Sequence, residues 1–88
     1  SKGTAVDVED EEIIAGVHLL AREEGLLCEL TTGVVIAALA HLGVAAGERV
    51  CCILTGNGIK DVNHEALRPN LAEPIEPDLE VLAARLGL

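Results

Sequence analysis

Four consecutive residues, Thr55-Gly56-Asn57-Gly58, have types and a spacing that could do chemistry. They come directly after the apolar run Val50-Cys51-Cys52-Ile53-Leu54, and a short run of this kind predicts a buried parallel strand. Two glycines at the exit of a strand let the backbone approach a ligand closely. Because ligands of open α/β sheets lie at the carboxyl ends of the strands, we expect a binding site at residues 55–58.

Each of these residues also has a plain structural interpretation. Thr55 could bond only the backbone of its own turn, and an Asn between glycines, as Asn57 is, is ordinary in a turn. Gly56 and Gly58 could be turn residues with positive φ or could give a ligand room, and one backbone shape serves both.

Other reactive residue types give weaker signals. Lys60 could form a Schiff base, since buried lysines shift their pKa readily, but a structural ion pair with its neighbour Asp61 is the simpler interpretation. Cys28 has no cation beside it in the sequence and is expected to be a small buried hydrophobe. The tight ligand pairs of a structural zinc site are absent from the set of histidines and cysteines, which are His18, His41, His64, Cys28, Cys51 and Cys52.

Three helices are predicted around the candidate site. Apolar residues at helical spacing, an acidic first turn and a terminal glycine predict a helix over residues 10–24. A second helix is expected over residues 33–42, capped by Thr31 or Thr32 and apolar almost all round. A last short helix over residues 79–86 would be capped by Asp78.

Strands and loops complete the predicted order. Residues 5–8 are expected as a short strand or an extended entry, residues 48–54 as a strand, and residues 26–30 as a brief extended segment. Residues 62–77 are expected to form a surface excursion, because Pro69, Pro74 and Pro77 interrupt any regular element. The resulting fold class is α/β: β-α-β-α-β-loop-α, a partial doubly wound sheet within a single segment, residues 1–88.

Composition excludes several classes of function. The chain has 88 residues, half of them apolar, and 6 Lys plus Arg against 15 Asp plus Glu, a formal net charge of −9. No basic cluster is present to neutralise a phosphate backbone, so nucleic acid is not expected as a partner. The same acidity would repel an anionic membrane surface, and no apolar run reaches the ~18 to 20 residues of a membrane span. An odd number of cysteines argues against a disulfide framework and for a reducing, cytoplasmic location.

Four segments together carry a family resemblance. They are V-E-D-E-E-I at residues 8–13, L-A-R-E-E-G-L-L-C-E at 20–29, T-G-N-G-I-K-D at 55–61 and the closing stretch from Pro74 to Leu88. In this order and spacing the chain resembles the carboxyl-terminal part of threonine synthases, which are pyridoxal-phosphate (PLP) enzymes of the tryptophan-synthase-β-like fold. The resemblance departs after Glu29, where the family has Pro and small residues and this chain has Leu30-Thr31-Thr32-Gly33.

The resemblance implies a role for the candidate residues. In the family the hydroxyl corresponding to Thr55 meets the pyridine nitrogen of PLP, and Gly56, Asn57 and Gly58 would line the same side of the pocket. A neutral hydroxyl does not hold the ring nitrogen protonated as a carboxylate would, which suits elimination and replacement chemistry. The Schiff-base lysine and the glycine-rich phosphate loop of the family have no counterpart in this sequence, so the resemblance implies that the chain is not active alone.

The whole enzyme would convert O-phosphohomoserine to threonine and phosphate, and a segment similar to threonine dehydratase is a rival interpretation. A third is a stand-alone, non-catalytic subunit or interaction module derived from a PLP enzyme. The expected partner is the missing amino-terminal part of the enzyme or a separate chain. Self-association is also expected, through the apolar helix over residues 33–42.

Overall fold

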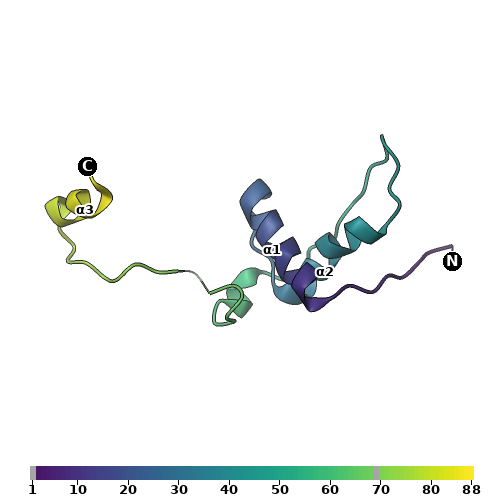
Figure 1. The fold of residues 1–88 in the computed structure, drawn as a ribbon, viewed down its shortest axis with the longest axis horizontal. Coiled ribbons are helices and arrows are strands. Elements are labelled where there is room, and N and C mark those ends of the chain that lie inside the picture. Colours follow the sequence, from purple (N-terminus) through teal and green to yellow (C-terminus); the bar gives the residue numbers. More distant parts are fainter. Residues whose placement is uncertain (1, 69) are drawn as a thin grey trace.

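The protein is described here by a computed structural model, which describes residues 2–68 and 70–88. Three α-helices, α1 (Asp10–Glu24), α2 (Leu30–Ala38) and α3 (Leu79–Leu86), are joined by two short 3-10 helices, η1 (Leu39–His41) and η2 (Gly58–Asp61). Figure 1 shows α1 and α2 side by side at the centre, with α3 alone at one end of the molecule.

The first helix has the bounds that the sequence predicts. Its start is fixed by reciprocal hydrogen bonds between Glu9 and Glu12, each side chain accepting from the backbone N–H of the other residue. Its end is fixed by Gly25, which adopts a left-handed conformation (φ 69°) and donates from its backbone N–H to the carbonyl of Ala21. The prediction for this helix is confirmed.

The second helix begins earlier than predicted. Glu29, and not Thr31 or Thr32, is its N-cap residue, and the helix tightens into η1 from Leu39. The backbone N–H of Leu30, at the first turn, donates to a carboxylate oxygen of Asp61 at 2.8 Å. A side chain distant in the sequence therefore fixes where this helix starts.

The core lies between α1 and α2. Val17, Leu20 and Cys28 are buried together, and Leu30, Ile36 and Leu67 pack against them. The two helices approach closely at glycines, since a Cβ on Gly33 would collide with the side chain of Val17 and one on Gly16 would lie 3.2 Å from the carbonyl oxygen of Gly33.

Residues 48–54 do not form the predicted strand, and residues 5–8 enter α1 without forming one. Within the described residues the only β pairing is an isolated antiparallel bridge between Cys28 and Asn57. Residues 48–54 run as an extended loop (Figure 1), because a central strand needs partners on both sides and this part of the chain supplies none. The partial doubly wound sheet is therefore not confirmed, since the described residues are mainly helical and form no strand.

Residues 70–88, at the carboxyl terminus, form an arm that carries α3. Asp78 caps α3 by accepting from the backbone N–H of Glu80 and Val81, as predicted, and Gly87 ends the helix. The stretch between residues 70 and 78 is extended and exposed, as the predicted surface excursion requires, while Pro69 lies outside the described residues. Residues 58–67 form η2 and further turns, so the excursion is ordered at its start.

The molecule is elongated as a result. Its principal extents are 61 × 28 × 19 Å and its radius of gyration is 18.0 Å, against about 12 Å for a compact chain of this length. Among the described residues, no helix is long and apolar enough to cross a membrane.

Candidate functional site

The predicted residues 55–58 lie against the turn between α1 and α2. Two backbone hydrogen bonds fix them there: the N–H of Glu29 donates to the carbonyl of Gly56 at 3.2 Å, and the N–H of Gly58 donates to the carbonyl of Leu27 at 2.9 Å. With Thr55 at one end, residues 55–57 and 25–28 line a hollow of about 450 Å³, which Leu54 completes.

The glycines serve contact between chain segments. Neither Gly56 nor Gly58 has a positive φ, so the turn-glycine interpretation is wrong for both. Both are buried, and a Cβ would collide with the side chain of Glu29 at Gly56 and with that of Leu27 at Gly58. Their small size thus lets residues 55–58 lie directly on the segment that precedes α2.

Asn57 closes its own turn. Its side-chain oxygen accepts from the backbone N–H of Ile59 at 2.9 Å, and its carbonyl accepts from that of Lys60 at 3.2 Å. This is the ordinary turn chemistry that the sequence also allowed, and it starts η2 directly after the candidate site.

Thr55 is an exposed residue, and its hydroxyl lies within hydrogen-bonding distance of the hydroxyl of Thr32. The Thr55 Oγ1 lies 3.4 Å from the Oγ1 of Thr32, which is buried at 3% exposure in the first turn of α2. The same Thr32 oxygen accepts from the backbone N–H of Gly56 at 3.0 Å and donates to Glu29 Oε1 at 3.4 Å. One buried hydroxyl thus touches the backbone and the side chain of the predicted site.

The ion pair at the site differs from the predicted one. Lys60 Nζ lies 3.3 Å from Glu29 Oε2, while Asp61 turns to the backbone N–H of Leu30. Lys60 and Asp61 therefore both hold the start of α2 and do not pair with each other. Glu29 is only 18% exposed on its side chain, so the pair neutralises a charge that lies beside the candidate site.

Glu29 and Thr32 are the site residues that the sequence analysis missed. A signal for them exists, because an acidic N-cap residue followed three positions later by a hydroxyl has the spacing of a capping interaction. Their contact with residues 55–56, more than 20 positions away, follows only from the folded chain.

Among the other reactive side chains, Cys28 belongs to the lining of this hollow and the histidines do not. Cys28 is a core residue, as predicted, and burial raises the pKa of its thiol. His18 Nε2 donates to the carbonyl of Ala66 at 2.8 Å, and His41 Nε2 lies 2.7 Å from Glu12 Oε1. Within residues 2–68 and 70–88, no three His, Cys, Asp or Glu side chains are grouped to hold a metal ion.

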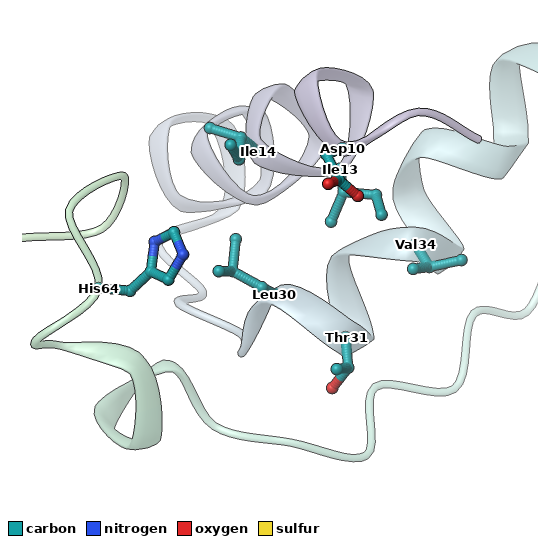
Figure 2. Close-up of a pocket in the computed structure, with 7 residues that line it drawn as sticks. All are labelled: Asp10, Ile13, Ile14, Leu30, Thr31, Val34 and His64. Carbon is teal, nitrogen blue, oxygen red and sulfur yellow. The ribbon is translucent and has the colours of Figure 1, made fainter.

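A second hollow, of about 350 Å³, opens between α1 and α2 on the side of His64 (Figure 2). It contains none of the predicted site residues, and its walls are mainly apolar. Its lining consists of Asp10, Ile13, Ile14, Leu30, Thr31, Val34 and His64.

Comparison with known proteins gives one family. Residues 1–56 match the family described as "Pyridoxal-phosphate dependent enzyme". The chain is 37% identical over 92 residues to a threonine synthase of Mycobacterium leprae, a match that covers the whole chain and 26% of that protein. It is 36% identical over 91 residues to a threonine synthase of Synechocystis, covering 99% of the chain and 24% of the relative. A threonine synthase of Methanocaldococcus jannaschii is 43% identical over 88 residues, with 93% and 21% covered. The chain thus spans about a quarter of the length of these curated relatives.

Proposed function

Because this chain belongs to the family of pyridoxal-phosphate dependent enzymes, we propose that it forms one wall of the cofactor pocket of a threonine synthase-like lyase. The whole enzyme would convert O-phosphohomoserine to threonine and phosphate. The observation that carries the proposal is the place of Thr55, an exposed residue that lines a hollow and whose hydroxyl lies 3.4 Å from that of the buried Thr32.

The residues present fit one edge of PLP. A neutral hydroxyl can donate to an unprotonated pyridine nitrogen, and the backbone of residues 55–58 is held against a second segment, which limits the movement of Thr55. When bound, PLP supplies an electron sink for elimination and replacement at the substrate carbons. In this proposal Thr55 orients the ring, while Gly56, Asn57 and Gly58 shape the wall beside it.

The amine and the phosphate cradle would come from outside this chain. Lys60 is engaged by Glu29 on the far side of the site residues, so it serves structure here. We propose that the complementary groups belong to the amino-terminal part of the enzyme, in the same polypeptide or in a separate chain.

The shape of the molecule supports such a partner. Its radius of gyration of 18.0 Å exceeds that of a compact chain, and apolar side chains lie open on the loop over 48–54 and on α3. Ile53 is 73% exposed and Leu79 is 80% exposed. Large apolar surfaces of this kind mark contact sites with other parts of a protein.

Two experiments test the proposal. The intact mass of the native polypeptide that carries this sequence should be several times 9.1 kDa; a mass near that value would favour a stand-alone subunit or interaction module. The isolated chain should form no threonine from O-phosphohomoserine, and activity should return when the rest of the family fold is supplied. Threonine formation by the isolated chain would contradict the proposal.

The role of Thr55 is tested in the assembled enzyme. Thr55→Val removes one hydrogen bond to the cofactor and should raise the dissociation constant for PLP by about tenfold. Thr31→Val is the matched control, because Thr31 lines the other hollow (Figure 2). Equal PLP binding by the Thr55 and Thr31 variants would show that Thr55 does not contribute to the cofactor pocket.

A further inference from the structure

Thr32 is the polar side chain on which the geometry of the candidate site converges. It is 3% exposed, lies in the first turn of α2, and contacts three other residues through one oxygen atom. The contacts join the helix start to the loop: the backbone N–H of Gly56, the hydroxyl of Thr55 and the carboxylate of Glu29.

These contacts use both the donor and the acceptor capacity of the Thr32 hydroxyl group. A threonine oxygen carries one hydrogen and can accept two hydrogen bonds. The Thr32 hydrogen points to the carboxylate of Glu29, which is the stronger acceptor because it is charged. The same hydrogen also faces the Thr55 oxygen at 3.4 Å, and a Thr32 lone pair accepts from the Gly56 N–H at 3.0 Å, so the Thr55 hydrogen stays free to donate to a pyridine nitrogen.

Glu29 is in turn held in place from two sides. Its second carboxylate oxygen lies 3.3 Å from the ammonium group of Lys60, and its side chain fills the space left by the missing Cβ of Gly56. The carboxylate therefore cannot swing away from Thr32 without breaking the ion pair. Lys60, Glu29, Thr32 and Thr55 form a continuous polar chain from the surface to the hollow.

We propose that Thr32 is a positioning residue for Thr55: it fixes the orientation of the Thr55 hydroxyl and the position of the Gly56 backbone, with Glu29 and Lys60 as its supports. This inference rests on the proposed role of Thr55 at the cofactor ring. Thr32 itself lies behind Thr55, and acts on the cofactor only through it.

The test compares three variants of the assembled enzyme. Thr32→Val keeps the size and branching of the side chain and removes the hydroxyl, Thr32→Ser keeps the hydroxyl and removes the methyl group, and Thr31→Val makes the same change one residue earlier. Thr31 is exposed, and among the described residues its hydroxyl has no hydrogen-bond partner. Circular dichroism of each variant reports whether α1 and α2 remain folded.

Two measurements then separate positioning from mere stability. Hydrogen exchange of the Gly56 amide should accelerate by about tenfold or more in Thr32→Val and stay near wild type in Thr32→Ser. The dissociation constant for PLP should rise by about tenfold in Thr32→Val, as in Thr55→Val, and should be restored in Thr32→Ser. In the double variant of Thr32 and Thr55 the two effects should not add, since they act through one contact.

The outcomes distinguish the two proposals. If Thr55→Val weakens PLP binding while Thr32→Val behaves like Thr31→Val, the positioning role is overturned and the proposed function stands. If Thr32→Ser fails to restore binding in a folded protein, the hydroxyl is not the operative group and the inference is again wrong. If the assembled wild type binds no PLP, or Thr55→Val leaves binding unchanged, the proposed function falls and the positioning role falls with it.

Discussion

At the scale of single residues, missing side chains set the closest contacts in this molecule. Gly33 lets α2 approach α1, and Gly56 lets the site loop lie against the side chain of Glu29. Neither glycine has a positive φ, so both are required by space and not by backbone conformation. In a chain without a single Phe, Tyr, Trp or Met, such close contacts make up for the absence of large core side chains.

Gly33→Ala should therefore weaken the helix pair. The new Cβ would collide with Val17 and lie 3.1 Å from the carbonyl oxygen of Ile13, so the helices must separate. We expect a loss of about 1–3 kcal/mol in the free energy of unfolding, measured by urea titration of the circular dichroism signal. Gly43→Ala is the control, because nothing lies within 4 Å of its Cβ position. Equal stability of the two variants would show that the helices do not pack through Gly33.

At the scale of elements, the sequence correctly predicted the helices whose start and end signals lie within the segment or directly beside it. The helix over 10–24 has its acidic start, its apolar period and its terminal glycine within the segment, and Asp78 caps α3 from the adjacent position. The start of α2 was misplaced, because the carboxylate that stabilises it belongs to Asp61, 31 residues away. Strand 48–54 was wrong because strand formation depends on neighbouring strands, which an apolar run does not reveal.

The candidate site shows the same division. Its location at residues 55–58 follows from a local motif and remains a prediction for cofactor binding. Its support by Glu29 and Thr32 could not be read from the motif, since the contacts cross from one segment to another.

The N-terminal turn of α1 and η1 share one pH-sensitive contact. Hydrogen bonds from the backbone of Glu9 and from the His41 side chain hold the pKa of Glu12 below its ordinary value of 4.5. The folded state thus favours the charged carboxylate. Its stabilising effect is fully present above pH 4.5 and is lost as the pH falls through the lowered pKa.

We therefore expect Glu12→Gln to destabilise the protein at neutral pH and to have a vanishing effect in acid. Thermal melting of wild type and of Glu12→Gln, from neutral pH to below pH 4.5, measures the difference in their stability. Glu11→Gln, one residue earlier in the same exposed first turn, is the control and should show no such convergence. A difference between wild type and Glu12→Gln that persists at low pH would contradict the assignment.

At the scale of the whole molecule, the chain is a helix pair from which the amino-terminal stretch, a loop and a carboxyl-terminal arm extend (Figure 1). The loop over 42–55 projects from one side and the arm bearing α3 from the other (Figure 1). Val17, Leu20, Cys28 and Ala37 are the buried apolar residues of the described chain, so most of its apolar side chains still face water. Such a molecule leaves apolar surface open to contact with another chain or segment.

The isolated chain should consequently self-associate. We expect a light-scattering mass above 9.1 kDa that rises with protein concentration, together with binding of a dye that reports exposed apolar surface. Leu79→Glu and Leu82→Glu on α3, and Ile53→Glu on the loop, would show which surface is used. A monomer at every concentration, without dye binding, would contradict this expectation.

The exposed segment over residues 49–54 has a consequence for the aggregation of the isolated chain. Within the described residues its backbone makes no hydrogen bond, and both of its edges are open while Val50 and Ile53 face water. An open apolar edge is a template for the same segment of another copy, and stacked copies would form cross-β fibrils. The charge of −9 opposes such stacking at neutral pH, and that repulsion disappears near the isoelectric point of about 4.5. In the isolated chain, mutual repulsion and not burial is therefore what limits fibril growth from this segment.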